Sequence, residues 1–555
     1  MELSINQISS LEKVRVNDFN EYKRVESRTV MQGERVSYQI PLSCESHSRY
    51  RAEITVESPL AEYVKLYSVK EVFMDMPVTA DFPEENYITK EPGFMPDVLV
   101  PLEEQKNIIF ITDKRSVVWV SIEIPRDFKA GDCEVSVNFK ITACWGDFNE
   151  PVCTEKCKMN LKVIPKAVPE QKLIYTRWFH IDCIASAHNV EIFSDEHWNL
   201  IQKYISAAVN TGQNMILVPI HTPPLDTESG WSRPCVQLVD IEKKGETYSF
   251  GFEKFHKYIG ICKECGVKYY EMAHMFTQWG AKYTPNIMVT ENGKTDYLFG
   301  WNVPATSQEY SRFLVQYVKA IIVELEKEGI EGNTYFHISD EPNSENIDNY
   351  EKALNLIKPL IGKCRIFDAL SHIEFYQKEL VKVPVTIVSS MEEFLKYDIE
   401  EQWAYYCVDP QSVYPNSFMA LPSSRLRILG FLLYKFGIKG FLHWGLNFYS
   451  SFKSWYPVNP YFSTSADGAF PSGDGFILYP SKDGVYPSIR SEVMYQAIED
   501  MNICFALEEY IGKEGVVELI DSLAGRNVRF NDYPYGNDYI ENLRAKIIEE
   551  IQKNL

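Results

Sequence analysis

Eight apolar, β-prone runs alternate with helical patterns between residues 172 and 447, and this alternation restricts the fold more than any other feature of the chain. The runs are KLIYTRWFH (172–180), NMILVPI (214–220), VKYYEMAHM (267–275), NTYFHI (333–338), RIFDAL (365–370), VPVTIV (383–388), WAYYCV (403–408) and GFLHWGLN (440–447). Their apolarity is continuous, as parallel strands covered by helices require. Eight strand–helix units close a (β/α)8 barrel, which we predict over residues 170–505. An open doubly wound sheet is the alternative, but no glycine-rich phosphate loop follows the first run.

Helix boundaries support the same organisation. Residues 195–212 end in Gly212, which suits a left-handed C-cap. Thr306 and Glu309 match a capping box ahead of a long helical pattern. From about residue 488 the chain is helical in pattern to its end, and we predict that residues 506–555 form a helical segment that packs on the barrel.

The first 165 residues have a different pattern. Short runs such as 35–42, 51–57, 116–124 and 133–143 are broken by turn residues, and the last of them alternates with period two. Spaced short strands without helical patterns predict an antiparallel β-sandwich over residues 1–165. Pro165 and Pro169 indicate an irregular linker between this domain and the barrel.

Charge and cysteine content exclude several classes of function. The formal net charge of −21, with no cluster of lysine and arginine, disfavours binding to nucleic acid or to an anionic membrane surface. The N-terminal residues show no basic segment followed by an apolar one, and 12 scattered cysteines suit reduced thiols, so we expect a cytoplasmic protein. Cys262 and Cys265 form a CxxC inside a helical pattern without a partner pair, so we expect no metal and no cofactor.

The stretch TYFHISDEPN ends the fourth barrel run with adjacent acids, Asp340 and Glu341. Catalytic groups of barrel enzymes gather at the carboxyl ends of the strands. The residues alone leave three interpretations: a glycosidase acid with its partner, a metal site, or a structural role in which Asp340 caps a helix near Ser344. No His-x-Asp or HExxH spacing supports a metal site, and His337 lies within the strand.

Because the two acids are adjacent in sequence, they are expected to have different catalytic roles from those of an ordinary glycosidase pair. Neighbours in an extended segment point to opposite sides, so Asp340 and Glu341 are not expected to face each other across one glycosidic bond. Glu341 would instead protonate the leaving oxygen, while Asp340 orients a nucleophile that the substrate itself carries, its 2-acetamido group. For this role Glu341 needs a raised pKa, which burial or the neighbouring Asp340 can supply.

Several blocks together resemble glycoside hydrolase family 123. They are FHISDEP, the upstream YTRWFHIDCIA and VPIHTPPLDT, and the downstream GFLHWGLNFY and FPSGDGFILYP, followed by SIRSEV. The resemblance covers about residues 170–510, and the N-terminal region is similar to the family's accessory domain more loosely. It implies an N-acetyl-β-galactosaminidase that retains configuration, with the stabilising role on Asp340 and the acid/base role on Glu341. Tyr449 stands where the family often has Trp.

Further residues at the ends of the runs are candidates for sugar binding, by rim position, aromatic character or match to the family blocks. Tyr405 or Tyr406 would contact the acetamido carbonyl, and Trp444 would stack on the sugar. His337 is expected to hydrogen-bond beneath the acids rather than carry the proton. The candidates are His180, Asp182, His221, Asp226, Gln278, Trp279, His337, Trp403, Tyr405, Tyr406, Trp444, Asn447 and Asp474.

We therefore expect an exo-acting, retaining glycosidase that uses substrate-assisted catalysis on glycans with a terminal β-linked N-acetylhexosamine. The alternatives are a β-N-acetylglucosaminidase, a conventional two-carboxylate glycosidase on the same barrel, and an inactive carbohydrate-binding protein. The aglycone and the oligomeric state stay open.

Overall fold

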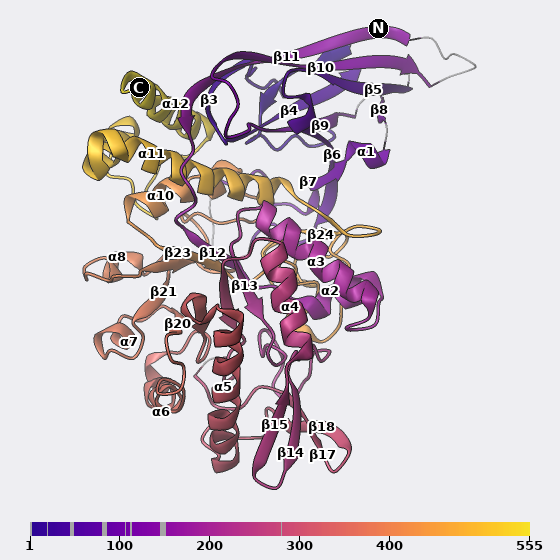
Figure 1. Ribbon diagram of the computed structural model, residues 1–555. Coiled ribbons are helices and arrows are strands. Elements are labelled where there is room, and N and C mark those ends of the chain that lie inside the picture. The colour runs from indigo at the N-terminus through magenta and orange to yellow at the C-terminus, as the bar shows by residue number, and fades with distance from the viewer. Residues whose placement is uncertain are drawn as a thin grey trace.

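The computed structural model describes residues 3–18, 20–44, 49–79, 86–105, 107–111, 114–144, 151–278 and 280–555. Figure 1 shows the N-terminal sheets at the top, the barrel below them, and the C-terminal helices beside the boundary between the two. The overall architecture is mixed α/β with several sheets.

A parallel barrel of eight strands forms the centre of the chain. Its strands are β12 (Ile174–Arg177), β13 (Met215–Val218), β16 (Tyr269–Met272), β19 (Thr334–Phe336), β20 (Arg365–Leu370), β21 (Val383–Ile387), β22 (Trp403–Tyr405) and β23 (Gly440–His443). The order is β12-β23-β22-β21-β20-β19-β16-β13. The two end strands are joined by the main-chain N–H of Asn214, which donates to the carbonyl of Tyr175 at 3.1 Å and nearly closes the barrel. Each predicted run contains one of these strands, so the predicted barrel is confirmed.

Helices follow most strands and cover the barrel (Figure 1). They are α2 (Ile181–His188), α3 (Asp195–Asn210), α4 (Glu253–Glu264), α5 (Gln308–Glu328), α6 (Ile347–Ile357), α7 (Glu374–Gln377), α8 (Met391–Phe394), α9 (Ser424–Arg427) and α10 (Leu429–Lys435). The predicted cap of α5 was wrong by one residue. Ser307, not Thr306, has the extended backbone of an N-cap, and its hydroxyl accepts from the N–H of Tyr310.

A small four-stranded sheet, which the sequence did not reveal, lies at the lower end of the barrel in Figure 1. Its order is β15-β14-β17-β18, with β14 (Asp240–Lys244), β15 (Thr247–Gly251), β17 (Ile287–Glu291) and β18 (Lys294–Phe299). These strands are short and carry many charged residues on an exposed face, which conceals their alternation.

Two sheets form the N-terminal region and share one hydrophobic core. One contains β1 (Leu3–Ile5), β2 (Ile8–Ser9), β4 (Arg35–Cys44), β6 (Val64–Met74), β7 (Gly93–Pro101) and β9 (Ser116–Glu123). The other contains β3 (Ser27–Gln32), β5 (Arg49–Glu57), β8 (Ile108–Ile111), β10 (Gly131–Ala143) and β11 (Pro151–Ala167). β11 continues through Pro165, where its register with β3 shifts, so the predicted linker begins later than expected. Proline is tolerated at such a bulge because no ladder N–H is required there.

The C-terminal helices α11 (Ile489–Ala524) and α12 (Asn537–Lys553) pack against each other, and α11 contacts α9, α10 and β7. Gly430 on α10 permits this closeness, because a Cβ there would lie 1.8 Å from the carbonyl oxygen of Ala497. A buried ion pair of Arg427 with Asp500, at 2.7 Å, crosses the same interface. The predicted boundary between residues 505 and 506 falls within α11, which bends at Gly512.

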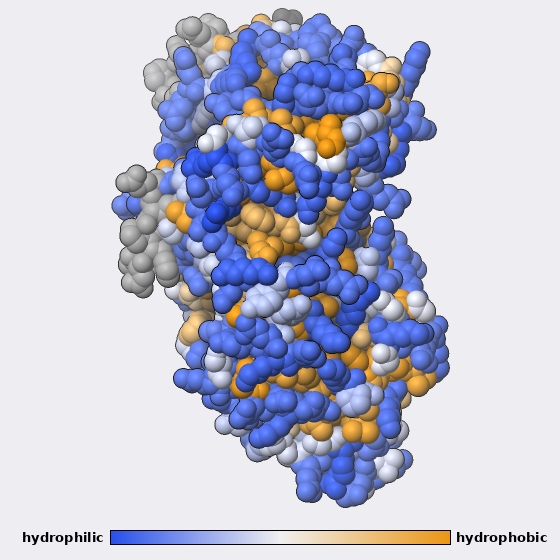
Figure 2. All heavy atoms as spheres, turned by 90° about the vertical axis from the view of Figure 1, so that its left-hand side faces the viewer, coloured by the Kyte–Doolittle hydropathy of each residue, from blue (hydrophilic) through white to orange (hydrophobic). Residues whose placement is uncertain are grey.

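Short elements complete the structure. They are α1 (Leu102–Gln105), β24 (Tyr479–Pro480) and β25 (Val485–Tyr486). Figure 2 shows one face of the molecule as mostly hydrophilic, with hydrophobic residues in small groups. Among the described residues, no helix has the length and apolarity needed to cross a bilayer.

Candidate active site

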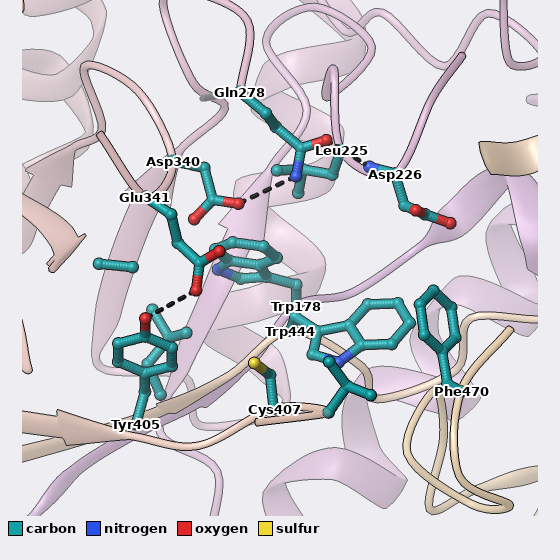
Figure 3. A pocket seen from close by; sticks show the side chains of 13 residues that line it. Trp178, Leu225, Asp226, Gln278, Asp340, Glu341, Tyr405, Cys407, Trp444 and Phe470 are labelled. Atoms are coloured by element: carbon teal, nitrogen blue, oxygen red, sulfur yellow. Dashed lines mark hydrogen bonds between the residues drawn. The ribbon is translucent and has the colours of Figure 1, made fainter. Parts of the chain in front are cut away.

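Asp340 and Glu341 lie in the loop that follows β19, which ends at Phe336. Glu341 has a left-handed backbone with φ of 43°. This conformation is uncommon for a residue with a side chain, costs on the order of 1 kcal/mol, and clusters at functional sites. The turn directs both side chains into one pocket (Figure 3). The expectation that the two carboxylates diverge along an extended strand therefore does not hold.

The pocket opens at the carboxyl end of the barrel, where the ends of β12, β20, β22 and β23 and the loops after β13, β16 and β19 meet. Residue 470, from the long loop after β23, completes it. Most of the lining is apolar or aromatic, with a few polar groups directed inward, as in typical sites for small ligands. The lining residues are Trp178, Leu225, Asp226, Gln278, Asp340, Glu341, Ala369, Tyr405, Cys407, Val408, Leu442, Trp444 and Phe470.

Two neutral donors hold the acid pair (Figure 3). The hydroxyl of Tyr405 donates to Oε1 of Glu341 at 2.7 Å, and Nε2 of Gln278 donates to Oδ2 of Asp340 at 2.9 Å. Oε1 of Gln278 accepts from the main-chain N–H of Asp226 at 2.8 Å. Gln278 therefore fixes Asp340 relative to Asp226, the third carboxylate of the pocket.

Burial raises the pKa of all three carboxyl groups, and a neighbouring negative charge adds to this at Asp340. Burial, followed by the charge of Glu341, raises the pKa of Asp340 to about 7. Burial also raises the pKa of Glu341, although the hydrogen bond from Tyr405 opposes this. Burial raises the pKa of Asp226 to about 6, against the charges of Arg233 and Lys453. Near neutral pH the adjacent pair therefore holds a proton that either member can donate.

The aromatic side of the pocket is formed by Trp444 and Phe470, whose ring centroids lie 5.0 Å apart. The indole N–H of Trp444 donates to Oδ2 of Asp474 at 2.8 Å. Asp474 is completely buried, and its other oxygen lies 3.3 Å from Nε2 of His443. The predicted sugar-binding residue Asp474 thus fixes the orientation of Trp444 in this structure and does not line the pocket.

Three further predicted residues lie behind this aromatic side. Asp182 forms a bidentate ion pair with Arg233 at 2.8 and 2.9 Å, and Arg233 also lies 3.1 Å from Nδ1 of His180. Asn447 exchanges two hydrogen bonds of 3.0 Å with the main chain of His180. Nε2 of His180 contacts the carbonyl of Trp444 at 3.1 Å. These side chains support the loop that carries Trp444.

Alternation at the end of β22 separates the remaining aromatic candidates. Tyr405 lines the pocket, whereas Tyr406 points to the helical layer and packs on Phe441. Trp403, at the start of β22, lies in the barrel core against Tyr335, away from the pocket. An amino-end position on the strand places its ring in a lower layer of the barrel.

His221 and His337 are both completely buried beneath the pocket. Nε2 of His221 contacts the carbonyl of His274 at 2.9 Å. His337 lies between the carboxylates of Glu271 and Asp368. The candidate Trp279 lies outside the described residues.

Several lining residues escaped the sequence analysis. Trp178, Leu225, Ala369, Cys407, Val408, Leu442 and Phe470 are apolar or weakly polar and resemble core residues in sequence. A usable signal existed for Trp178, because a tryptophan directly after a barrel strand lies at the catalytic rim. Arg233, Glu271 and Asp368 were also missed, since their partners are distant in sequence.

No group of three or more histidine, cysteine, aspartate or glutamate residues suited to a metal ion occurs within the described part of the chain. Cys262 on α4 and Cys265, the C-cap residue of that helix, are free thiols.

Comparison with known proteins gives a family and an extensive structural likeness. The model of the glycoside hydrolase 123 catalytic domain matches residues 178–507. A family 123 glycoside hydrolase from Clostridium perfringens, reported in a study of glycolipid glycan hydrolysis, shares 17% identity and a TM-score of 0.73 over 100% of this chain and 98% of that chain. This likeness shows the fold.

Two further structural matches are weak. An MSP family member from C. elegans has 8% identity and a TM-score of 0.14 over 25% of this chain and 92% of that chain. A PapD-like domain of human CEP192 has 11% identity and a TM-score of 0.14 over 26% of this chain and 84% of that chain. Neither likeness supports an argument about fold. A search of curated proteins found no match.

Proposed function

The chain belongs to glycoside hydrolase family 123 and is a glycoside hydrolase acting on glycans, and on that premise we propose that it releases terminal β-linked N-acetylgalactosamine by substrate-assisted, retaining catalysis. The observation that supports this most is the position of Asp340 and Glu341 side by side in one pocket, each held by a neutral donor. The resemblance described above assigns the stabilising and acid/base roles to a pair of this kind.

In the proposed reaction, the carbonyl oxygen of the 2-acetamido group attacks the anomeric carbon. Glu341 protonates the leaving oxygen. Asp340 accepts a hydrogen bond from the acetamido N–H and stabilises the positive oxazolinium ring. Glu341 then removes a proton from water, which attacks the anomeric carbon from the face that the aglycone left. Two inversions give net retention.

Substrate binding would determine which carboxyl group of the pair holds the proton. An N–H that donates to Asp340 stabilises its ionised form, so the shared proton moves to Glu341, where the leaving group needs it. Trp178, Trp444 and Phe470 supply apolar surfaces for the sugar ring and the acetamido methyl group. Tyr405, already bonded to Glu341, would keep the acid directed at the glycosidic oxygen.

A conventional two-carboxylate mechanism is the second candidate, and Asp226 is the observation that favours it. Asp226 lines the same pocket as Glu341 but comes from a different barrel segment, as the partner carboxylate of ordinary glycosidases usually does. In that mechanism Asp226 would act directly on the anomeric carbon, and the acetamido group would not be needed.

The N-terminal sheets are proposed to form an accessory sandwich.

Aryl β-glycosides that differ at C2 and C4 test both mechanisms. We expect turnover of the N-acetylgalactosaminide, weaker turnover of the N-acetylglucosaminide, and none of the galactoside, which lacks the 2-acetamido group. NMR of the first product should show the β-anomer, and a thiazoline analogue of the intermediate should inhibit strongly. Rapid cleavage of the galactoside would replace the substrate-assisted mechanism with the conventional one, and an equal or higher rate on the glucosaminide would overturn the C4 preference.

A further inference from the structure

His337 lies beneath the acid pair with a carboxylate at each ring nitrogen. Its Nε2 is 3.0 Å from Oε2 of Glu271, on β16, and its Nδ1 is 3.3 Å from Oδ1 of Asp368, on β20. All three side chains are completely buried. A neutral imidazole has one N–H and one lone pair, so it can donate to only one of these carboxylates. The arrangement therefore requires a second proton, either on the imidazole or on one of the acids.

The other contacts of the two carboxylates decide where this proton lies. Glu271 accepts from the hydroxyl of Thr176 and from the indole N–H of Trp178. Asp368 accepts from the hydroxyl of Tyr350 at 2.5 Å and from the main-chain N–H after the imidazole at 3.0 Å. The indole and main-chain N–H groups can only donate, and the two hydroxyls are placed to donate as well, so these contacts stabilise both carboxylates in their ionised forms. The proton therefore belongs on the ring.

The two faces of the ring are also suited to a cation. The ring of Phe367 lies 4.2 Å away on one side, and that of His274 is stacked at 4.0 Å. A cation over an aromatic face is attracted to the ring electrons. Burial lowers the pKa of His274 well below its ordinary value, so this neighbour stays neutral. Burial lowers the pKa of His337 as well, but the hydrogen bonds to Asp368 and Glu271 outweigh it and raise the value to about 9.

We propose that His337 is held as an imidazolium and that its charge favours the ionised form of Asp340, which otherwise faces carboxylates alone. This inference rests on the proposed function, because only substrate-assisted catalysis needs an ionised Asp340 beside a protonated Glu341. It assigns His337 as a positioning residue that acts through Asp340. It also explains why the barrel buries two carboxylates, Glu271 and Asp368, under a site that is already acidic.

The charges around Asp340 show why one cation matters. The groups that act on it electrostatically are Glu341 and Asp368, which raise its pKa, and His337, which lowers it, together with the hydrogen bond from Gln278. Around His337 itself, β16 contributes Glu271, the loop after it contributes neutral His274, and β20 contributes Asp368. Removal of the imidazolium leaves Asp340 among carboxylates alone, so its pKa rises and less of it is ionised at neutral pH.

NMR of protein labelled with ¹⁵N in its histidine rings tests the charge directly. The His337 signals are identified by their absence in His337→Gln. We expect both ring nitrogens to carry protons at pH 7 and to lose one only near pH 9. A neutral ring at pH 7 would overturn the proposal, whether or not the protein cleaves any glycoside.

The pH profile of kcat tests the consequence. In His337→Gln, the acidic limb should move up by about one pH unit or more, with roughly a 10-fold loss of kcat for each unit below it. Phe367→Leu is the control, since it disturbs packing against the same ring but leaves the charge, and its acidic limb should stay in place. An unchanged limb in His337→Gln, or an equal shift in the control, would contradict the proposal.

A second variant covers the case in which His337→Gln does not fold. Glu271→Gln keeps the size of the side chain but removes one of the two charges, so the ring should lose its proton within the neutral range. ¹³C signals of labelled aspartate, assigned by their absence in Asp340→Asn, then show whether the titration of Asp340 moves upward with it. If the titrations of His337 and Asp340 were both unchanged, the proposal would be wrong. This measurement needs no substrate. Failure of the proposed function is recognised separately, by wild-type protein that does not cleave N-acetylhexosaminides.

Discussion

The acid side of the pocket and its aromatic side are anchored in different parts of the chain. Asp340 and Glu341 are held by Gln278 and Tyr405, and all four residues follow or end barrel strands. Phe470, on the aromatic side, comes from the loop at residues 464–474, which is held directly by Asp75 and, through Arg490, by Asp97. Barrel strands thus fix the acids and Trp444 from below, whereas the N-terminal region fixes the loop that carries Phe470 from outside.

Asp75, which directly follows β6, is the main anchor of the aromatic side. Its Oδ1 accepts from the hydroxyls of Thr464 and Ser472 at 2.8 and 3.0 Å, and its Oδ2 accepts from that of Ser465 at 2.6 Å. In the sequence, Phe470 lies between Ser465 and Ser472. Asp75 therefore holds the loop on both sides of Phe470.

A second anchor joins the same parts of the structure. Asp97 on β7 pairs with Arg490 at 2.8 Å, and Arg490 donates to the carbonyl of Gly473 at 2.5 Å. Gly473 directly precedes Asp474, which orients Trp444. The difference indicates separate roles for the two sides of the pocket. The acid side positions the carboxylates, and the aromatic side sets the shape of the sugar-binding surface.

Glu341→Gln should give the largest effect, because it removes the proton that the leaving group needs. We expect kcat to fall by about 10²–10⁴-fold on substrates with a poor leaving group, and by much less on activated aryl glycosides. The exposed Glu345 provides a matched control, and Glu345→Gln should be near wild type. An equal loss on both kinds of leaving group would contradict the acid role.

Asp340→Asn should give a somewhat smaller effect of about 10²–10³-fold in kcat, as expected when a preorganised stabilising group is removed. The loss should be similar for good and poor leaving groups, because Asp340 acts on the positive ring and not on the departing oxygen. Steady-state kinetics on both kinds of glycoside measure this. Near-normal rates would show that the acetamido group needs no carboxylate here.

Asp75→Ala tests the aromatic side. We expect KM to rise roughly 10-fold and kcat to change less, because the loop that carries Phe470 becomes less well positioned while the acids are not affected. Asp75→Asn should be intermediate, because the amide keeps one acceptor oxygen for Thr464 and Ser472 but cannot accept from Ser465. Asp132→Ala, at an exposed position of β10, is the control. A loss confined to kcat would mean that the two sides are not separate.

The difference between the two sides also explains what could be predicted from the sequence. The barrel and the acid pair follow from local signals: continuous apolar runs, helix patterns and two acids at a strand end. Even there, the left-handed backbone of Glu341 was not visible, because no glycine or asparagine marks it. An extended chain was therefore assumed where a turn occurs.

The aromatic side could not be predicted in the same way. Asp75 lies 389 residues from Thr464, and Asp182 lies 51 residues from Arg233. Such pairs leave no periodic pattern, so a single sequence carries no signal that joins them. Trp403 shows the opposite difficulty, since an aromatic residue near a strand end can equally fill the core. Domain limits at residues 165, 170 and 505 stay predictions.

The smallest expected effect concerns stability, where the two sides should differ in sign. The pKa of Asp340 is raised to about 7 from 3.8, so the folded state binds a proton that the unfolded state has lost between these values. Stability from this group is therefore present below about pH 4 and is lost as the pH rises to about 7. Asp340→Asn removes the penalty and should raise the melting temperature at pH 8 by a few degrees, with no gain at pH 4.

Asp75→Asn should instead lower the melting temperature at both pH values, because it removes the hydrogen bond that Asp75 accepts from Ser465. Thermal denaturation of the two variants and of wild-type protein at pH 4 and pH 8 measures the contrast. If Asp340→Asn is no more stable than wild type at pH 8, the acid side holds no electrostatic strain. The pKa of Asp340 would then not be raised in the folded protein, because a pKa raised by burial or by repulsion carries this penalty at pH 8.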